Sequence, residues 1–305
     1  MHLKKMEILE PAPIQHEETH TLGDHTRLRC VSAEPETENR PWLEDQSVCK
    51  ELAMYQILHA GVMQARYPYE VVRVRQGGAF FLQTLRGKGR VLINGTWQVI
   101  EEGQACLLPA YKTNAIHCIE GEEWDFCWVR YRHPSEQVPL ITVAEPIISD
   151  FNSDQISAAI LGILAEAEEA GSSIIVEQWA RLIHLYVKRF VAPHQADERL
   201  WELWVDVEKN LAENWTLDIM SAKVGLSSEH VRRLCKEEHG KSPMQQVRWM
   251  RMQRAGELLL TTDYKIESIG YDVGYKNSTV FSSAFRKQFA MNPSEYRAKN
   301  ALIGV

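Results

Sequence analysis

Two stretches of this sequence share one pattern: VGLSSEHVRRL at residues 224–234 and VGYKNSTVFSS at residues 273–283. Each begins with Val-Gly and one bulky apolar residue and continues with a polar cluster. A helix-turn-helix needs a small residue where its helices cross, a glycine for the turn and a polar cap for the second helix. The sequence therefore predicts two such motifs. Their small, turn and cap residues are Ser221, Gly225 and Ser227 in the first motif and Gly270, Gly274 and Asn277 in the second.

The second helix of each motif is predicted to have one apolar and one polar face, because its apolar residues recur at i, i+3 and i+4. An outward stripe of Arg, Lys and hydroxyl side chains is what readout in the major groove requires, since arginine can bond guanine through two hydrogen bonds. A single stripe would also fit an ordinary solvated face, but two stripes behind two correctly spaced turns favour DNA binding. The predicted DNA-contacting residues are Glu229, Arg232, Arg233 and Lys236 in the first motif and Thr279, Ser282, Ser283, Arg286 and Lys287 in the second.

Residues 200–298 resemble the double helix-turn-helix domain of AraC/XylS transcription regulators. The resemblance rests on three stretches: RMQRAGELLLTTD at 251–263, IESIGYDVGYKNSTVFSSAFRKQF at 266–289 and NPSEYR at 292–297. It implies that the two second helices enter successive major grooves on one face of the DNA, joined by a central helix over residues 244–260.

Carried over by position, the resemblance assigns base contacts in one groove to Glu229, Arg232 and Arg233, and in the next groove to Thr279 and Ser283. The sequence departs from the family pattern at two places. Ser283 stands where the family often has arginine, which weakens the expected base readout by the second motif. Ala290 replaces a frequent glycine before NPSEYR, which matters little.

The charge of this 305-residue chain is unevenly distributed. The net charge is −7, yet residues from 200 onward include 15 Lys/Arg and 13 Asp/Glu, leaving 19 basic and 28 acidic residues before them. An acidic front half and a mildly basic back half are compatible with DNA binding by the C-terminal part. The apolar fraction of 45% and the charged fraction of 25% are those of an ordinary globular protein and exclude fibrous or disordered classes.

The N-terminus carries Glu7, Glu10 and two prolines where a signal peptide would need an uninterrupted apolar segment. Nowhere do about 18 apolar residues run together, as a membrane helix requires. The sequence therefore predicts a cytoplasmic protein without a membrane partner. The six cysteines are scattered without a C-x-x-C pair, which predicts small buried residues rather than disulfides or zinc ligands.

Residues 69–132 carry the signals of short antiparallel strands, rich in β-branched and aromatic residues and divided by glycines. Asn94-Gly95 lies between VLI and TWQVI, which is a strong hairpin signal because both residues tolerate positive φ. Many short strands with tight turns predict an antiparallel barrel or sandwich of jelly-roll type. Of these two, we expect a cupin-like jelly-roll β-barrel over about residues 45–135. Residues 15–38 show no clear pattern.

Helical periodicity predicts two further helices, over about residues 153–171 and 173–191. The second has an apolar stripe wider than packing on one small barrel requires, so either a second copy of the chain or burial within the chain covers it. The predicted fold class is α+β with two domains: a ligand-sensing and dimerisation domain at 1–192, a linker at 193–199, and a double helix-turn-helix domain at 200–305. The apolar stripe of the helix predicted over residues 173–191 comprises Ile175, Trp179, Leu182, Tyr186 and Phe190.

Cupin-type barrels are often metal enzymes, but only His117 lies in the strand region before His133. No metal, cofactor or catalytic residue is therefore expected. TLRGKG, AIHC and EEWDFCWVRY resemble barrel segments of an arabinose-responsive member of the same family, in which an Arg, a His and a Trp hold the sugar. This resemblance implies a sugar pocket lined by Arg86, His117 and Trp128, to which Trp124 on the same strand face adds. Purely structural roles for these residues remain the alternative.

The sequence thus predicts a homodimeric transcription regulator that binds promoter DNA and a small-molecule effector, most simply a sugar, and that works with RNA polymerase. One alternative is a ligand-independent activator whose barrel only dimerises. The other is a cupin-like carbohydrate enzyme with a regulatory tail, which would hold a metal and turn over a sugar.

Overall fold

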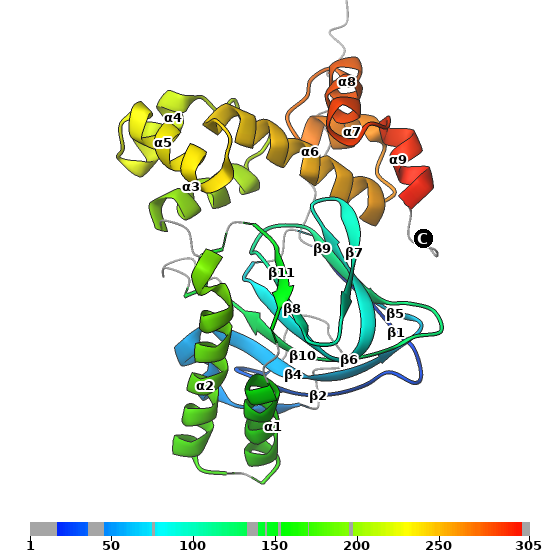
Figure 1. The fold of residues 1–305 in the computed structure, drawn as a ribbon, viewed down its shortest axis with the longest axis vertical. Coiled ribbons are helices and arrows are strands. Elements are labelled where there is room, and N and C mark those ends of the chain that lie inside the picture. The colour runs from blue at the N-terminus through cyan, green and yellow to red at the C-terminus, as the bar shows by residue number, and fades with distance from the viewer. Residues whose placement is uncertain are drawn as a thin grey trace, which may run out of the picture.

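The computed structural model consists of a curled β-sheet domain, two helices packed beside it, and an all-helical C-terminal domain (Figure 1). The fold class predicted from the sequence is confirmed. The structure describes residues 17–35, 46–74, 77–132, 140–143, 145–151, 154–169, 171–194 and 198–300.

The described strands are β1 (Glu17–Leu22), β2 (Arg27–Ser32), β3 (Ser47–Val48), β4 (Ile57–Arg66), β5 (Tyr69–Val74), β6 (Phe80–Ile93), β7 (Thr96–Glu101), β8 (Gln104–Leu108), β9 (Asn114–Cys118), β10 (Glu123–Tyr131) and β11 (Ile147–Asp150). Their order along the curled sheet is β1-β5-β9-β6-β10-β4-β2-β3, with β7 and β8 paired to β6 and β11 paired to β8. The pair β2–β3 is parallel and the other described pairs are antiparallel.

Strand β6 joins the two sides of the curled sheet because it belongs to both of them. Its first half pairs with β10 and β8, and its second half pairs with β7 and β9. The strand signals on the two sides of Gly87 therefore belong to one strand, which continues through this glycine at φ 72°. The hairpin predicted at Asn94-Gly95 is confirmed, since both residues have positive φ, 50° and 72°.

The sheet begins earlier than the sequence pattern indicated. Residues 17–32 form β1 and β2, and β4 precedes the first predicted strand. Strand β1 reads EETHTL and lacks an apolar alternation, because two of its inward-facing residues are the polar Glu18 and His20. Periodicity alone could not reveal such a strand.

Helices α1 (Asp154–Glu168) and α2 (Ser173–Val191) match the two predicted helices. They pack against each other beside β4, with α2 also contacting the short 3-10 helix η2 (Lys50–Tyr55), as Figure 1 shows at the lower left. Ile160 and Ile183 share a buried cluster with Phe81 of β6 and Tyr131 of β10. One side of α2 is thus used for burial within the chain.

The C-terminal domain contains α3 (Glu198–Lys209), α4 (Leu217–Val224), α5 (Ser228–His239), α6 (Pro243–Thr261), α7 (Ile266–Asp272), α8 (Ser278–Phe289) and α9 (Pro293–Asn300). The predicted turn chemistry is confirmed in both motifs. Gly225 and Gly274 have φ of 63° and 86°. The Ser227 side chain accepts a hydrogen bond from the His230 N–H, and Asn277 caps α8 in the same way.

All six cysteines are buried and free, as the sequence predicted. No described helix is long and apolar enough to cross a membrane.

The glycines of the barrel offer a matched test of its closure. A Cβ on Gly87 would lie 1.9 Å from the Glu123 carbonyl oxygen, whereas a Cβ on Gly103, at a similar φ of 81°, would meet nothing within 4 Å. Gly103→Ala should cost about 1–2 kcal/mol of unfolding free energy through backbone strain alone. Gly87→Ala should cost about 1–3 kcal/mol more because β6 and β10 must separate. Denaturant unfolding measures both, and equal losses would contradict the role of Gly87.

Candidate nucleic-acid interface and effector cavity

Helix α6 fixes the two helix-turn-helix motifs relative to each other. Val247 and Met250, in its first half, share a core with α3, α4 and α5. Leu258 and Leu259, in its second half, share a core with α7, α8 and Tyr296 of α9. Figure 1 shows α4 and α5 at one end of α6 and α7 and α8 near the other. The predicted central helix at 244–260 is thus α6, and both motifs are rigidly attached to it.

In α5 the two faces are as predicted. Val231 and Cys235 are fully buried, whereas Glu229, Arg232, Arg233 and Lys236 are exposed. The Arg233 guanidinium donates to both carboxylate oxygens of Glu237 at 2.9 Å and contacts His230 Nε2 at 3.0 Å. The Lys236 ammonium donates to the Gly240 carbonyl at 2.8 Å. These partners lie on the surface, so Arg233 and Lys236 can exchange them for DNA at little cost.

In α8, Phe281 and Phe285 are buried against α6 and α7. Its outward face carries Thr279, Ser283, Arg286 and Lys287, which are exposed, and Ser282, which is half-buried. This face has fewer cations near its N-terminus than α5, as the sequence indicated. The first turns of the outward face of α8 therefore offer hydroxyl groups, and its arginine and lysine stand in the last turn.

Helix α6 also packs on the outside of the barrel. Met252 and Ala255 belong to one buried cluster with Val72 and Val74 of β5, Leu92 of β6 and Ala115 of β9. The core of the second motif therefore continues directly into the outer face of the sheet. A movement of β5 or β9 cannot leave α6 undisturbed, because close-packed interiors transmit displacement.

Polar contacts surround this apolar patch. The Arg254 guanidinium, 1% exposed, donates to the Thr113 hydroxyl, and the Tyr296 hydroxyl donates to the Gly95 carbonyl. Lys112 Nζ lies 3.1 Å from Glu145 Oε2, and Glu145 Oε1 accepts a hydrogen bond from the Gln246 side chain at 3.1 Å. The contact between the barrel and the DNA-binding domain is thus partly ionic.

A cavity opens inside the barrel, with about 330 Å³ of empty space including its mouth. Its wall combines aromatic and aliphatic side chains with two histidines and one arginine. That composition is typical of small-molecule sites, which are largely apolar with a few placed polar groups. The lining residues are His20 and Leu22 of β1, His59 and Met63 of β4, Tyr69, Val71 and Arg73 of β5, Phe80 of β6, and Phe126 and Trp128 of β10.

Two pairs of side chains order the polar part of the cavity. The Trp128 indole N–H donates to His59 Nδ1 at 2.8 Å, which places the imidazole proton on Nε2. Arg73 Nε donates to Glu18 Oε1 at 3.0 Å, and the Arg73 guanidinium lies 4.3 Å from the centroid of Phe80. Burial raises the pKa of Glu18, but Arg73 and His20 outweigh it and hold the pKa well below its usual range. Arg73 thus lines the cavity, and Glu18, which lies beside the lining, neutralises its charge.

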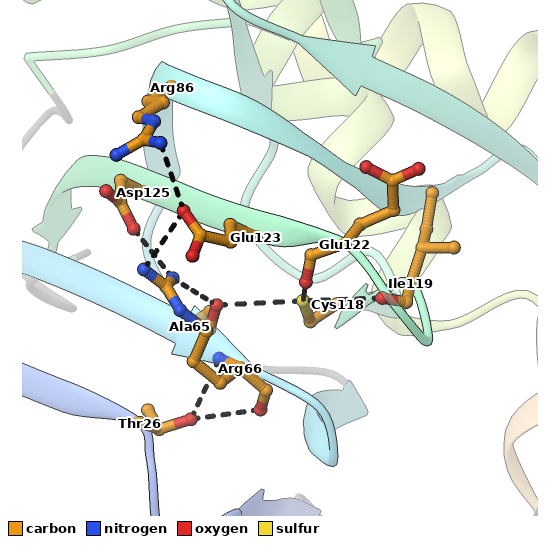
Figure 2. Close-up of polar contacts among 9 residues, drawn as sticks. All are labelled: Thr26, Ala65, Arg66, Arg86, Cys118, Ile119, Glu122, Glu123 and Asp125. Atoms are coloured by element: carbon orange, nitrogen blue, oxygen red, sulfur yellow. Dashed lines mark hydrogen bonds and ion pairs between the residues drawn. The ribbon is translucent and has the colours of Figure 1, made fainter.

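Of the four predicted ligand residues, Trp128 alone lines this cavity. Arg86 follows the inward-facing residues of β6, but the pairing of β6 with β10 shifts by one residue between Thr84 and Arg86, which places Arg86 opposite Asp125 on the outer face. Its side chain is 71% exposed and Nη2 lies 3.5 Å from Glu123 Oε2. Figure 2 shows this pair beside Arg66, which contacts both Glu123 and Asp125. The structure thus corrects the position of Arg86, which lies at the barrel surface.

His117 and Trp124 also lie outside the cavity lining, for different reasons. Ile116 and Cys118 point into the barrel, so the alternation of a strand turns His117 to the outer face, where its ring packs on Trp97. Burial lowers the pKa of His117. Trp124 does share the inward face with Trp128, but it is fully buried and its indole N–H donates to the Thr84 hydroxyl at 3.1 Å. It is a core residue of the barrel.

The sequence prediction missed most of the cavity. The strongest signal of the cavity in the sequence was Arg73, a charged residue within the apolar run YEVVRV. On this strand Tyr69, Val71 and Arg73 share one face. His59 and His20 lie on strands that the sequence pattern did not reveal. Among the described residues, no group of three or more His, Cys, Asp or Glu side chains is placed to hold a metal.

Comparison with known families agrees with this geometry. Residues 57–186 match the AraC-like ligand binding domain, and residues 220–299 match a helix-turn-helix domain. The first match covers the barrel from β4 to α2, and the second covers both motifs with α6.

The chain joins the two domains of an AraC/XylS-family regulator. Its relatives include the lactose operon transcription activator of Staphylococcus xylosus, 33% identical over 91 residues, which are 30% of this chain and 33% of that protein. The HTH-type transcriptional activator RhaS of Enterobacter sp. (strain 638) is 31% identical over 101 residues, which are 33% of this chain and 36% of that protein. The matched segments span about a third of these relatives' length. They are regulators rather than enzymes.

A crystal structure of ToxT from Vibrio cholerae O395 aligns with 76% of this chain and 92% of its own, at 14% identity and a TM-score of 0.44. The family identification rests on the two matched domains.

The contact between the barrel and α6 predicts a pH dependence. Burial raises the pKa of Glu257 from 4.5 to about 8, although Arg254 opposes the shift. Between these values the folded chain holds a proton that the unfolded chain lacks, so stability falls as pH rises. The melting temperature should therefore fall from pH 6 to pH 9, and Glu257→Gln should reduce that fall. Glu267→Gln, at an exposed site of α7, is the control; an undiminished fall in Glu257→Gln would contradict this assignment.

Proposed function

We propose that this chain is a sequence-specific, DNA-binding transcription regulator controlled by a small molecule in the barrel cavity. The observation that carries the proposal is the pair of exposed polar stripes on α5 and α8, held at the two ends of one buried helix. Two helices fixed in this way can enter successive major grooves of one duplex. The duplex is promoter DNA, and RNA polymerase is the partner that such a regulator acts on.

Strand β5 is the proposed link between effector and DNA. Tyr69, Val71 and Arg73 line the cavity, while Val72 and Val74, on the other face of the strand, pack in one cluster with α6. An effector shifts the equilibrium between two arrangements only if it binds them with different affinity. Contact with β5 supplies that difference, because each arrangement of α6 requires its own position of β5.

We propose that a second copy of the chain covers the outer face of α2. Ile175, Leu182 and Leu185 are exposed there and, with Gln178, follow the 3-4-3 spacing of a helix-pairing seam. The opposite face of α2 is already buried within the chain, so this stripe needs another partner. Such a homodimer would present four helix-turn-helix motifs to two half-sites.

The sugar predicted as effector remains a prediction. The resemblance that suggested it rested on Arg86, His117 and Trp128, of which Trp128 alone lines the cavity. Trp128 could still cover the C–H face of a ring, and His59 could bond a hydroxyl group. The ligand-independent activator, in which the barrel only dimerises, is the remaining alternative. That alternative gives no role to the buried ion pair of Arg73 and Glu18 beside an open cavity.

The DNA interface is tested by selecting bound sequences from a random pool and measuring affinity for the selected site. Arg233→Ala should lose about 1–3 kcal/mol of binding free energy and relax the preference at one base position. Arg27→Ala removes an exposed arginine of β2 and should leave affinity unchanged. If Arg233→Ala binds as tightly and as selectively as the unsubstituted chain, Arg233 does not read bases.

The pairing surface is tested by sedimentation velocity at micromolar concentration. Leu185→Glu should convert a dimer to a monomer, because a carboxylate would have to be buried in an apolar seam. Val99→Glu is a matched control, since Val99 on β7 is 49% exposed and Leu185 is 48% exposed. A dimer that persists in Leu185→Glu would exclude α2 as the pairing surface.

A further inference from the structure

The buried Arg73 requires an anion. Its side chain is 4% exposed and lies against Phe80, so water cannot compensate its charge. An unpaired buried charge is strongly unfavourable, and a partner with good geometry is needed. Asn114 Oδ1, 3.5 Å from Arg73 Nη1, supplies only a weak polar contact. Among the described residues, Glu18 is the one carboxylate that forms an ion pair with Arg73.

Glu18 comes from a strand at the edge of the sheet. Strand β1 stands at the end of the sheet order and pairs with β5 only, where Glu18 lies opposite Arg73. None of its residues from Glu18 to Leu22 is fully buried. By contrast, five of the six residues of β5 are buried. The anion that neutralises Arg73 is thus carried by an edge strand, which can separate from the sheet at lower cost than any central strand.

The rest of the wall suits an apolar body. Beyond Arg73 and the two histidines, the lining consists of four aromatic and three aliphatic side chains. Phe126 lies between Tyr69 and Trp128, with ring centroids 6.0 and 6.3 Å away. A ligand with an aromatic or branched apolar body and one anionic end would satisfy both parts of the cavity.

We propose that the effector is an organic carboxylate with an apolar body, which replaces Glu18 as the anionic partner of Arg73. The inference rests on the proposed function and names the chemical class of its effector. The exchange keeps the cavity neutral, because one carboxylate takes the place of another. It also exploits the planar guanidinium, which can bond a carboxylate through two parallel hydrogen bonds. Glu18 is then released to water together with β1.

This exchange gives the effector a structural consequence. Glu18, His20 and Leu22 all lie on β1, and His20 and Leu22 line the cavity beside it. A ligand carboxylate at Arg73 therefore removes the buried contact that holds β1 over the cavity. Strand β5 loses its partner on that edge while its other face remains packed on α6.

The full 305-residue chain and three variants test the proposal: Glu18→Ala, Glu18→Gln and Arg73→Met. The probes are phenylacetate and its neutral counterpart phenylacetamide, titrated while tryptophan fluorescence and melting temperature are recorded. Phenylacetate should bind the unsubstituted chain at least tenfold more tightly than phenylacetamide, and Glu18→Ala at least tenfold more tightly again, because no internal carboxylate competes. Arg73→Met should lose the preference for the carboxylate.

Glu18→Gln, which keeps the shape of the side chain, should show the same order if Glu18→Ala does not fold. Glu123→Ala is the matched control, since it removes an exposed carboxylate from Arg66 and Arg86 outside the cavity. It should leave both affinities unchanged. Equal binding of phenylacetate and phenylacetamide, or binding of neither, by the unsubstituted chain and the Glu18 variants would overturn the proposal. DNA affinity is measured on the same samples. If the chain binds its DNA site but shows no preference for the carboxylate, only this inference fails; if it does not bind DNA, the proposed function fails.

Discussion

The burial of α6 on three sides is the constraint on which the rest of the molecule depends. One end of the helix belongs to the core of the first motif, the other end to the core of the second, and its remaining side to the outer face of the barrel. An isolated amphipathic helix would need one apolar stripe, but here Arg254 and Glu257 are buried as well. Burying the Arg254 guanidinium is costly unless it has partners, and the barrel supplies one in the Thr113 hydroxyl, so this polar contact favours one arrangement of barrel and motifs.

That arrangement makes β5 the shared wall of two functional regions. Because successive side chains of a strand point to opposite faces, Arg73 reaches into the cavity while Val72 and Val74 contact the cluster of α6. In the proposed function, the coupling between effector and DNA therefore passes through one strand rather than through a long chain of contacts. It is reciprocal by thermodynamic necessity: the factor by which the effector changes DNA affinity is the factor by which DNA changes effector affinity.

Local chemistry decided how much of this could be predicted from the sequence. Turn glycines, caps and helix faces act within a few residues, so both motifs and α6 followed from patterns such as VGLSSEHVRRL. The cavity depends instead on which strands pair. Arg86 and His117 lay at the expected places in the sequence, but the register shift of β6 against β10 and the alternation of β9 direct them away from the interior. Strand β1 carries no periodic signal, so its pairing of Glu18 with Arg73 could be seen only in the folded chain.

Hydrogen exchange of the full chain, measured by mass spectrometry with and without its selected DNA, tests the central claim most directly. If β5 joins the two regions, DNA binding must change amide protection in β5 (Tyr69–Val74) and β9 (Asn114–Cys118) as well as in α5 and α8. The change in the strands should shrink in Val72→Ala, which loosens the packing on α6 without touching the cavity face. Changes confined to residues 198–300 would show that the barrel and the DNA-binding domain act independently, and would contradict the account.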